Sequence, residues 1–301
     1  MISKEELLQK YNLTEDAFVS ANISWEELTL IYEDFKSKRS RYEHARNSFL
    51  RDYLEDTDRA GIHSYRSRIK DPEHLIAKII RKRNDAYKKY KALTLDNYEH
   101  FLTDLIGFRV FILFKEDWTH FHEYITSQIV NDKHNYITTW TDECPADNCF
   151  IEAPKVHIRT GDKRDIYQTH IHDSDIYTDK VYRSVHYTIK YQGVYLEIQL
   201  RTLFEESWGE IDHSIAYPYY RNNENLNEFS AMINRLAGLA DEMGSYFRHI
   251  KEREIEHLDH LEHEETPQPV ATSLPQVQST DVSANDSFCT PEDMVNALLR
   301  E

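Results

Sequence analysis

The hydrophobic pattern is clearest in residues 182–202, where apolar and polar side chains alternate on either side of Gln192-Gly193. Successive side chains of a β-strand point to opposite faces, so the alternation predicts two strands joined by a tight turn, with one apolar and one polar face. The polar face carries His186, Thr188, Lys190, Glu197 and Gln199. The turn also sets the register, and the expected opposite pairs are Tyr191 with Val194, Thr188 with Glu197, and His186 with Gln199.

Helical spacing of apolar residues dominates the N-terminal segment, residues 1–58. The capping-box pattern, which marks helix starts, occurs at Ser3 with Glu6 and at Ser24 with Glu27. Another helix is expected after Asp71-Pro72, because proline fits the first turn of a helix. Its apolar stripe is Leu75, Ile76, Ile79 and Ile80, and its other face is basic, with Lys78, Arg81, Lys82 and Arg83.

The central part of the chain combines a buried strand with less regular segments. The apolar run 106–114 is rich in β-forming residues and predicts a buried strand, with Asp104 at its entrance. Residues 118–131 are expected to be helical. Alternation at 156–159 suggests one arm of a hairpin, and the polar segment 164–180 suggests a loop over the site.

The C-terminal part predicts two helices, over 203–213 and 225–264, followed by a change of composition to Thr, Pro, Gln, Ser and Val. A short amphipathic helix is expected at the end, with Met294, Val295, Leu298 and Leu299 apolar. The expected organisation is a helical segment 1–58, a catalytic-type domain 59–220, a long helix 221–265, a flexible linker 266–289 and a terminal helix 290–301.

Composition and charge narrow the class of protein. The net charge of −17 argues against wrapping duplex DNA, which requires dense lysine and arginine. No run of about 18 apolar residues predicts a membrane span, and the first residues do not resemble a secretory signal. Three cysteines are too few for a disulfide framework in a chain of 301 residues, so a cytoplasmic location is expected.

Two carboxylates are the candidate chemical centre. Asp104 precedes one strand and Glu197 lies on another, and carboxylates that converge from neighbouring strands can hold Mg²⁺, which prefers oxygen ligands. Cations suited to phosphate surround them in the sequence, namely Arg66, Arg68, Lys70, Lys78, Arg109, Arg183 and Arg201. Tyr182 offers a platform for a base. Taken singly, each carboxylate also fits a solvated or salt-bridged position, Arg66 and Arg68 fit a solvated face, and Tyr182 fits a half-buried strand position.

Four motifs in a fixed order make the chemistry more specific. They are Arg68-Ile69-Lys70-Asp71-Pro72-Glu73, Asp104-Leu105-Ile106-Gly107-Phe108-Arg109-Val110, Tyr182-Arg183-Ser184-Val185-His186 and Glu197-Ile198-Gln199-Leu200-Arg201-Thr202. Over roughly residues 60–220 this order resembles the synthetase domain of the RelA/SpoT family, the (p)ppGpp synthetases. No counterpart of the family's hydrolase domain precedes the motifs, so the chain is expected to make its product without degrading it.

The resemblance implies an α+β, nucleotidyltransferase-like fold, a mixed β-sheet with packed helices, here with helical N- and C-terminal extensions. It implies Mg²⁺-dependent transfer of pyrophosphate from ATP to the 3′-hydroxyl of GDP or GTP. Asp104 would be a metal ligand, and Glu197 a second ligand or the base. The implied nucleotide-binding residues are Arg66, Arg68, Lys70, Lys78, Arg109, Tyr182, Arg183, His186, Gln199 and Arg201.

One departure leaves the acceptor open. The family commonly has Asn-Gly before the tyrosine, whereas this chain has Lys180-Val181. Transfer to adenosine nucleotides or to the 3′ end of tRNA, as in growth-arresting toxins, is therefore an alternative, and the basic cluster Arg81, Lys82, Arg83, Lys88, Lys89 and Lys91 would suit tRNA. A catalytically inactive nucleotide-binding module is a second alternative, against which Asp104 and Glu197 both argue.

Further interpretations concern metals and partners. Cys144, Cys149 and His157 are a weak candidate for zinc, because their spacing is poor and a fourth ligand is not evident. The terminal helix is open to two interpretations, docking of a partner or an internal clamp, since an amphipathic helix after a flexible linker suits either role. Homo-oligomer formation is open as well. No membrane partner is expected.

Overall fold

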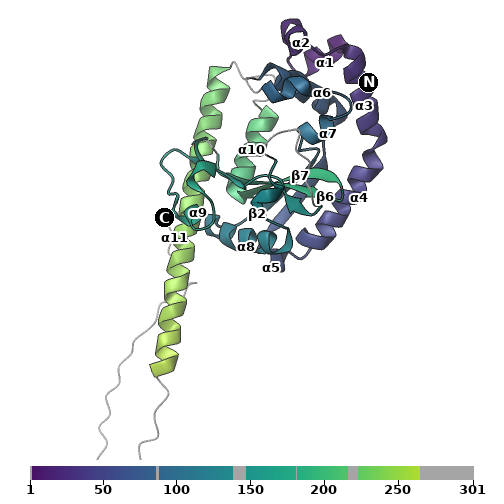
Figure 1. Ribbon diagram of the computed structural model, residues 1–301. Helices are drawn as coiled ribbons and strands as arrows, with labels where there is room; N and C mark the ends of the chain where they lie inside the picture. The colour runs from purple at the N-terminus through teal and green to yellow at the C-terminus, as the bar shows by residue number, and fades with distance from the viewer. Residues whose placement is uncertain (1, 86–87, 138–146, 181, 216–222, 265–301) are drawn as a thin grey trace, which may run out of the picture. The chain divides into compact units, whose positions relative to one another are not determined.

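The computed structural model describes residues 2–85, 88–137, 147–180, 182–215 and 223–264 (Figure 1). The chain divides into two compact units after Arg253. The described part of the second unit is the end of a long helix, as far as Glu264. The expected linker 266–289 and terminal helix 290–301 lie outside the described residues.

A seven-stranded mixed sheet forms the centre of the first unit. Its strands are β1 (Ser64–Ile69), β2 (Ile106–Ile112), β3 (Cys149–Phe150), β4 (Lys155–Arg159), β5 (Ile176–Lys180), β6 (Ser184–Tyr191) and β7 (Val194–Thr202). Their order is β1-β2-β7-β6-β4-β5, with β3 also paired to β6. The pairs β2–β7 and β4–β5 are parallel and the others antiparallel. The predicted α+β architecture with a mixed sheet is confirmed.

The predicted hairpin is confirmed with its register. Thr188 lies opposite Glu197, His186 opposite Gln199, and Tyr191 opposite Val194. The turn residues Gln192 and Gly193 both have positive φ, 49° and 71°, which matches the twist of the two strands that they join. The buried strand after Asp104 is likewise confirmed as β2.

Helices surround the sheet on both sides (Figure 1). The N-terminal ones are α1 (Lys4–Lys10), α2 (Glu15–Ala21), α3 (Trp25–Ser37), α4 (Arg39–Phe49), η1 (Leu50–Leu54) and α5 (Thr57–Ala60). The central ones are α6 (Pro72–Asn84), η2 (Lys88–Ala92), α7 (Tyr98–Phe101), η3 (Lys115–Asp117), α8 (Trp118–Gln128), η4 (Lys133–Asn135), α9 (Asp165–Gln168) and η5 (Asp173–Asp175). The last two are α10 (Leu203–Ile215) and α11 (Glu224–Glu264).

One face of the sheet is covered by aromatic packing, which leaves the other face for polar residues. Phe49 of α4 lies 4.9 Å from the Phe108 ring of β2 and 5.2 Å from the Tyr191 ring of β6. From α8, the Trp118 indole donates a hydrogen bond of 3.1 Å to the hydroxyl of Tyr187. All five side chains are buried, so the odd-numbered positions of β6 face the core and its even-numbered positions face the opposite side.

The two predicted capping boxes differ. At α1, Ser3 Oγ accepts from Glu6 N at 3.2 Å and Ser3 N donates to Glu6 Oε2 at 2.9 Å, so the box is complete. At α3, Ser24 Oγ accepts from Glu27 N at 3.1 Å. The Glu27 carboxylate does not complete that box, because it accepts from the main chain of Leu95 at 3.3 Å instead.

Three sequence-based expectations are corrected. Residues 164–180 are not a loop, since they contain α9, η5 and β5, and β4 pairs with β5 in parallel instead of forming a hairpin with the next strand. Buried Ile176 explains the strand, because it anchors β5 to the core despite its polar neighbours. Arg83 does not belong to a solvated basic face, because its buried guanidinium donates to the carbonyls of Ala21, Asn22 and Leu93.

Candidate active site

The two candidate carboxylates share one cavity. Asp104 lies just before β2, and Glu197 lies on β7, which is parallel to β2 and pairs with it at Gly107. Asp104, Gly107 and Glu197 all line a cavity of about 330 Å³ at this polar face. Because Gly107 has no side chain, the strand beside Glu197 leaves the cavity open.

Asp104 is held as an anion by two lysines. Its Oδ2 lies 2.5 Å from Lys70 Nζ and 2.6 Å from Lys78 Nζ. Burial by itself would raise the pKa of this carboxyl, but the two ammonium groups outweigh burial and hold the pKa well below its usual range. The second oxygen, Oδ1, is buried and has no hydrogen-bond partner among the residues that the structure describes. One oxygen of an ionised carboxylate is therefore left for a ligand.

Glu197 has the opposite electrostatics. Burial, followed by the negative charge of Asp104, raises the pKa of its carboxyl. Gln199 Nε2 donates to Glu197 Oε2 at 2.7 Å, and His186 Nδ1 lies 3.6 Å from Oε1. Two neighbouring carboxyls whose pKa values are moved in opposite directions are typical of a site that separates a charge-binding role from a proton-accepting role.

Arginines form the wall of this cavity next to α10. Arg109 of β2 pairs with Glu206 at 2.8 Å and with Glu210, and Glu210 lies 3.6 Å from Arg66. Arg201 donates to Gln199 Oε1 at 2.9 Å and lies 3.5 Å from Glu206. The chain therefore supplies counter-charges of its own for arginines that were predicted to bind phosphate.

A second cavity, of about 530 Å³, adjoins the first, since Arg68 and Asp104 line both. Its basic residues are Arg68, Lys70, Lys78, Arg81 and Lys82, and its acidic ones are Asp71, Asp85 and Asp104. The excess of cations at one end of a cleft that begins at Asp104 suits a polyphosphate chain.

Aromatic and imidazole rings gather at the end of the hairpin. The Arg201 guanidinium lies 5.6 Å from the Tyr182 ring centre, within cation–π range. The ring of His157, from β4, lies 5.8 Å from Tyr182 and 4.8 Å from His186. Tyr177 of β5 stacks on His157 at 5.3 Å. Tyr182 and His186 are thus brought to one corner of the polar face.

The zinc interpretation is wrong for two of its residues. Cys149 pairs with Lys190 at one end of β6, whereas His157 pairs with Ser184 at the other end. Six strand positions separate the two, on the order of 20 Å. Cys144 lies outside the described residues, and no group of three or more metal-binding side chains was found within the described part of the chain.

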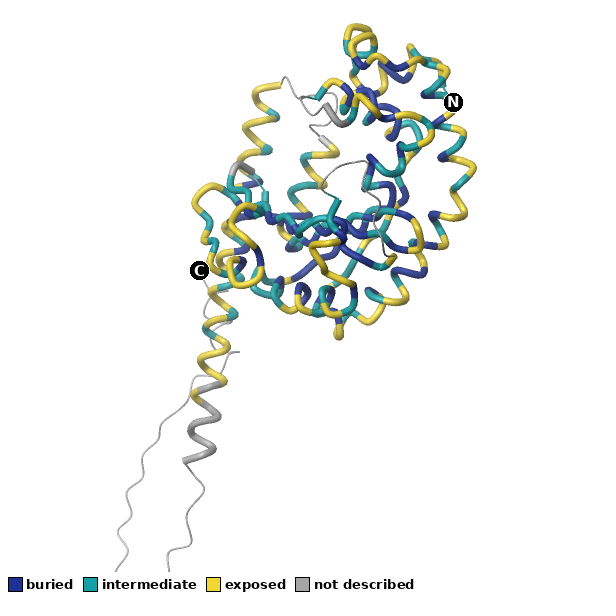
Figure 2. The backbone as a smooth tube through the Cα atoms, viewed as in Figure 1, coloured by how far each residue is buried: buried dark blue, intermediate teal, exposed yellow. Residues whose placement is uncertain are grey.

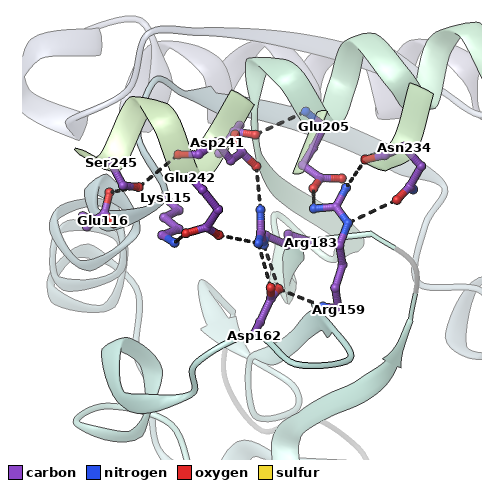
Figure 3. A network of polar contacts seen from close by, with 11 residues as sticks. Lys115, Glu116, Arg159, Asp162, Arg183, Glu205, Asn234, Asp241, Glu242 and Ser245 are labelled. Atoms are coloured by element: carbon purple, nitrogen blue, oxygen red, sulfur yellow. Dashed lines mark hydrogen bonds and ion pairs between the residues drawn. The ribbon is translucent and has the colours of Figure 1, made fainter. Parts of the chain in front are cut away.

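Four of the predicted site residues line neither of the two cavities at Asp104, namely Tyr182, Arg183, His186 and Arg201. Arg183 lies in a separate network of polar contacts (Figure 3). It donates two bonds of 2.7 Å to Asp162 and further bonds to Asp241 at 3.1 Å and Glu242 at 2.7 Å. These acceptors come from the segment after β4 and from α11. Sequence reasoning could not find them, because Asp241 and Glu242 follow Arg183 by nearly 60 residues without a motif of their own.

Glu206 and Glu210 also escaped prediction, and His157 was predicted only as a zinc ligand, not as a neighbour of Tyr182 and His186. Glu206 and Glu210 are one helical turn apart on α10, a spacing that places both on one face, and this was the available signal. The side chains of Lys88, Lys89, Lys180 and Val181 lie outside the described part of the structure. Lys180-Val181 is the pair that replaces the family's Asn-Gly before Tyr182.

The mixed sheet, its packed helices and the carboxylates of Asp104, just before β2, and Glu197, on the parallel strand β7, define an α+β protein of the nucleotidyltransferase-like class. Residues 67–222 of the 301-residue chain match a family described as the region found in RelA/SpoT proteins. The chain belongs to the RelA/SpoT family, and its enzyme class is that of the pyrophosphokinases.

Several solved structures are similar to the chain. A GTP pyrophosphokinase family protein from Streptococcus pneumoniae is 22% identical over 73% of this chain and 96% of that one, with a TM-score of 0.45. Small alarmone synthetase 1 from Bacillus subtilis bound to its product pppGpp is 19% identical over 76% of this chain and 98% of that one, with a TM-score of 0.41. The same synthetase bound to AMPCPP is 18% identical over 76% of this chain and 99% of that one, with a TM-score of 0.40. No curated protein matched the chain.

Among the described helices, none combines the length and the apolar character that crossing a membrane would require.

Proposed function

We propose that the chain transfers pyrophosphate from ATP to the 3′-hydroxyl of GDP or GTP, which yields (p)ppGpp and AMP. The observation that carries the proposal is the pair Asp104 and Glu197, in one cavity and with pKa values moved in opposite directions. Family membership supplies the reaction class. We also propose that the protein acts in the cytoplasm, as its cysteine content suggests.

The residues fit a magnesium ion at Asp104. Oδ1 of Asp104 is a buried oxygen with no partner among the described residues, and Glu197 adds a second carboxylate in the same cavity. Oxygen ligands of this kind are those that Mg²⁺ prefers. Bound there, the ion would neutralise charge on the ATP phosphates.

The chain's own residues then position the two substrates. Lys70, Lys78 and Arg68 line the basic cleft and would bind the phosphates of ATP. Tyr182, with Arg201 across its ring, would stack on the acceptor base. The acceptor oxygen attacks the β-phosphorus, the bond from that phosphorus to the α-phosphate oxygen breaks, and AMP leaves. Glu197 takes the proton of the 3′-hydroxyl, and its raised pKa suits this role.

Acceptor identity is tested by incubating the protein with ATP labelled on its β-phosphate, Mg²⁺ and one acceptor at a time: GDP, GTP, AMP, ADP, unlabelled ATP or tRNA. Label is expected on GDP or GTP, with AMP as the other product. Label on tRNA alone, or on adenosine nucleotides alone, would contradict the guanosine assignment. Absence of transfer to every acceptor would favour an inactive nucleotide-binding module.

The role of Glu197 as a base predicts that kcat/KM depends on pH. Only the ionised carboxylate accepts a proton, so kcat/KM should fall as the pH decreases, with a midpoint above the ordinary range of glutamate because the pKa is raised. Glu197→Gln should lower kcat by about 10²- to 10⁴-fold and abolish this dependence. The measurement is transfer rate against pH in both proteins.

The matched control is Glu152→Gln. The Glu152 carboxylate accepts a hydrogen bond of 2.6 Å from Thr188, the residue opposite Glu197 in the sheet, but Glu152 does not line the cavity of Glu197. It should keep the wild-type rate and profile. An unchanged rate in Glu197→Gln would remove Glu197 from the mechanism.

A further inference from the structure

The long helix α11 carries a row of exposed apolar residues. Six large side chains, between 51% and 63% exposed, form what we call the apolar seam: Phe229, Met232, Leu236, Leu239, Met243 and Tyr246. Figure 2 shows that much of this helix is exposed. Single exposed apolar residues are normal on a protein surface, but six in one stripe of one helix indicate an interaction surface.

The spacing of the apolar seam specifies the shape of its partner. Its members follow one another at intervals of three, four, three, four and three residues. This alternation is the a/d pattern of a heptad repeat, which packs against another helix with the same pattern. From residue 229 to 246 the seam spans roughly 26 Å at the rise of an α-helix. The pattern therefore fits a helix as its partner.

The opposite side of α11 is polar, and it is this side that contacts the domain (Figure 3). Asn234 and Asp241 are buried, 8% and 2% exposed. Arg159 donates to Asn234 Oδ1 at 3.2 Å, Arg183 binds Asp241 at 3.1 Å, and Ser245 Oγ donates to Glu116 at 3.0 Å. The helix is thus oriented by charged and polar contacts with its apolar seam turned away from them.

These contacts prevent the helix from burying its seam in its own domain. Rotation about the helix axis would break the ion pairs that Arg183 makes with Asp241 and Glu242, and so remove two of the acidic partners of this guanidinium. Two surface ion pairs hold the helix in the same orientation. Lys115 lies 2.6 Å from Glu242, and Asp117 pairs with Arg248. The seam therefore needs a partner from outside this domain.

We propose that the apolar seam pairs with the seam of a second copy of this chain, in antiparallel orientation. A two-fold axis between Leu236 and Leu239 places Leu236 against the partner's Leu239. The same symmetry matches Met232 with the partner's Met243, and Phe229 with the partner's Tyr246. A surface that meets its own copy in this way closes into a dimer without further growth.

Charges beside the seam favour this occupant and this orientation. Arg235 and Glu242 both flank the seam, at equivalent heptad positions, and both are exposed. In the antiparallel arrangement Arg235 comes near the partner's Glu242, and the symmetry repeats the pair. In a parallel, in-register pair Arg235 would instead face the partner's Ala240, and Glu242 the partner's Phe247, so two opposite-charge contacts would be lost.

The test is the mass of the full chain in solution by sedimentation over a range of concentrations. A dimer is expected for the unmodified protein and a monomer for Leu236→Glu with Leu239→Glu, which places four carboxylates together at the centre of the seam. Arg235→Glu should weaken the dimer by roughly tenfold, because it turns two attractive pairs into repulsive ones. Circular dichroism checks that each variant folds.

The matched control is Leu30→Glu, at an apolar residue of α3 that is 55% exposed and lies off the seam. It should leave the dimer intact. A monomer for the unmodified chain, or a dimer that survives both leucine substitutions, would overturn the proposal. If the unmodified chain is a monomer, hydrogen exchange on the seam is compared with that of Leu298→Glu. Loss of protection in this variant would assign the surface to residues 290–301 of the same chain instead.

Discussion

Asp104→Asn is expected to lower the rate of pyrophosphate transfer by roughly a thousandfold. The carboxylate is a candidate ligand of a cation that supplies several kcal/mol of charge stabilisation in the transition state, and each 1.4 kcal/mol is tenfold in rate. The change also leaves Lys70 and Lys78 near each other without the anion that both now contact at Oδ2. Single-turnover transfer from labelled ATP at saturating Mg²⁺ measures the effect.

Asp85→Asn is the matched control for Asp104. Asp85 lines the adjoining cavity and pairs with Lys82 at 2.8 Å, but it is only partly buried and does not line the cavity that Glu197 lines. A partly exposed pair contributes at most about 1 kcal/mol, so this variant should stay within roughly fivefold of the wild-type rate. Equal losses in both variants would mean that the cleft senses total charge, and that Asp104 has no special role.

Arg183→Ala is expected to lower the free energy of unfolding by about 3–5 kcal/mol, because it removes one partner of a buried ion pair. The side chain of Asp241 is fully buried, and burial already raises its pKa even with Arg183 present. Without the guanidinium the carboxyl would favour its protonated form still more. The deficit should therefore be smaller at pH 5 than at pH 8, as denaturant titrations at both pH values would reveal.

Two further variants separate the role of Arg183 from a general effect of charge. Asp241→Asn in the Arg183→Ala background should recover part of the lost stability, since it removes the unpaired carboxylate. Arg248→Ala breaks partly exposed pairs with Asp117 and Glu252 and should cost about 1 kcal/mol or less. Unchanged stability of Arg183→Ala together with a raised KM for the acceptor would instead support the nucleotide-binding role that the motif suggested.

Local patterns carried much of the prediction. The hairpin could be predicted with its register because strict alternation flanks a turn of Gln192 and Gly193, which accept positive φ. Asp104 and Glu197 could be brought together because one precedes a buried strand and the other lies on the polar face of a second. Their neighbourhood in the folded chain follows from the parallel pairing of β2 and β7.

Contacts between segments that are distant in the sequence could not be predicted from it. The buried partners of Arg183, on α11, and of Arg83, in loops and helix ends, leave no periodic trace, since each depends on how separate elements dock. Strand β5 was missed because only one of its five residues is an aliphatic core residue. Periodicity predicted the helix 225–264, but which side of α11 meets the domain is decided by its charged and polar contacts, and these are not periodic.

The two sides of α11 respond to salt in opposite directions. Mobile ions screen the partly exposed pairs that join the helix to its domain, such as Lys115 with Glu242 and Arg248 with Asp117. Strongly hydrated anions such as sulfate, in contrast, strengthen the burial of apolar surface. A rise in sulfate would thus weaken the surface pairs between the helix and its own domain while it tightened any helix seated on the apolar seam, and the buried pair of Arg183 with Asp241 would remain as the salt-insensitive contact of α11.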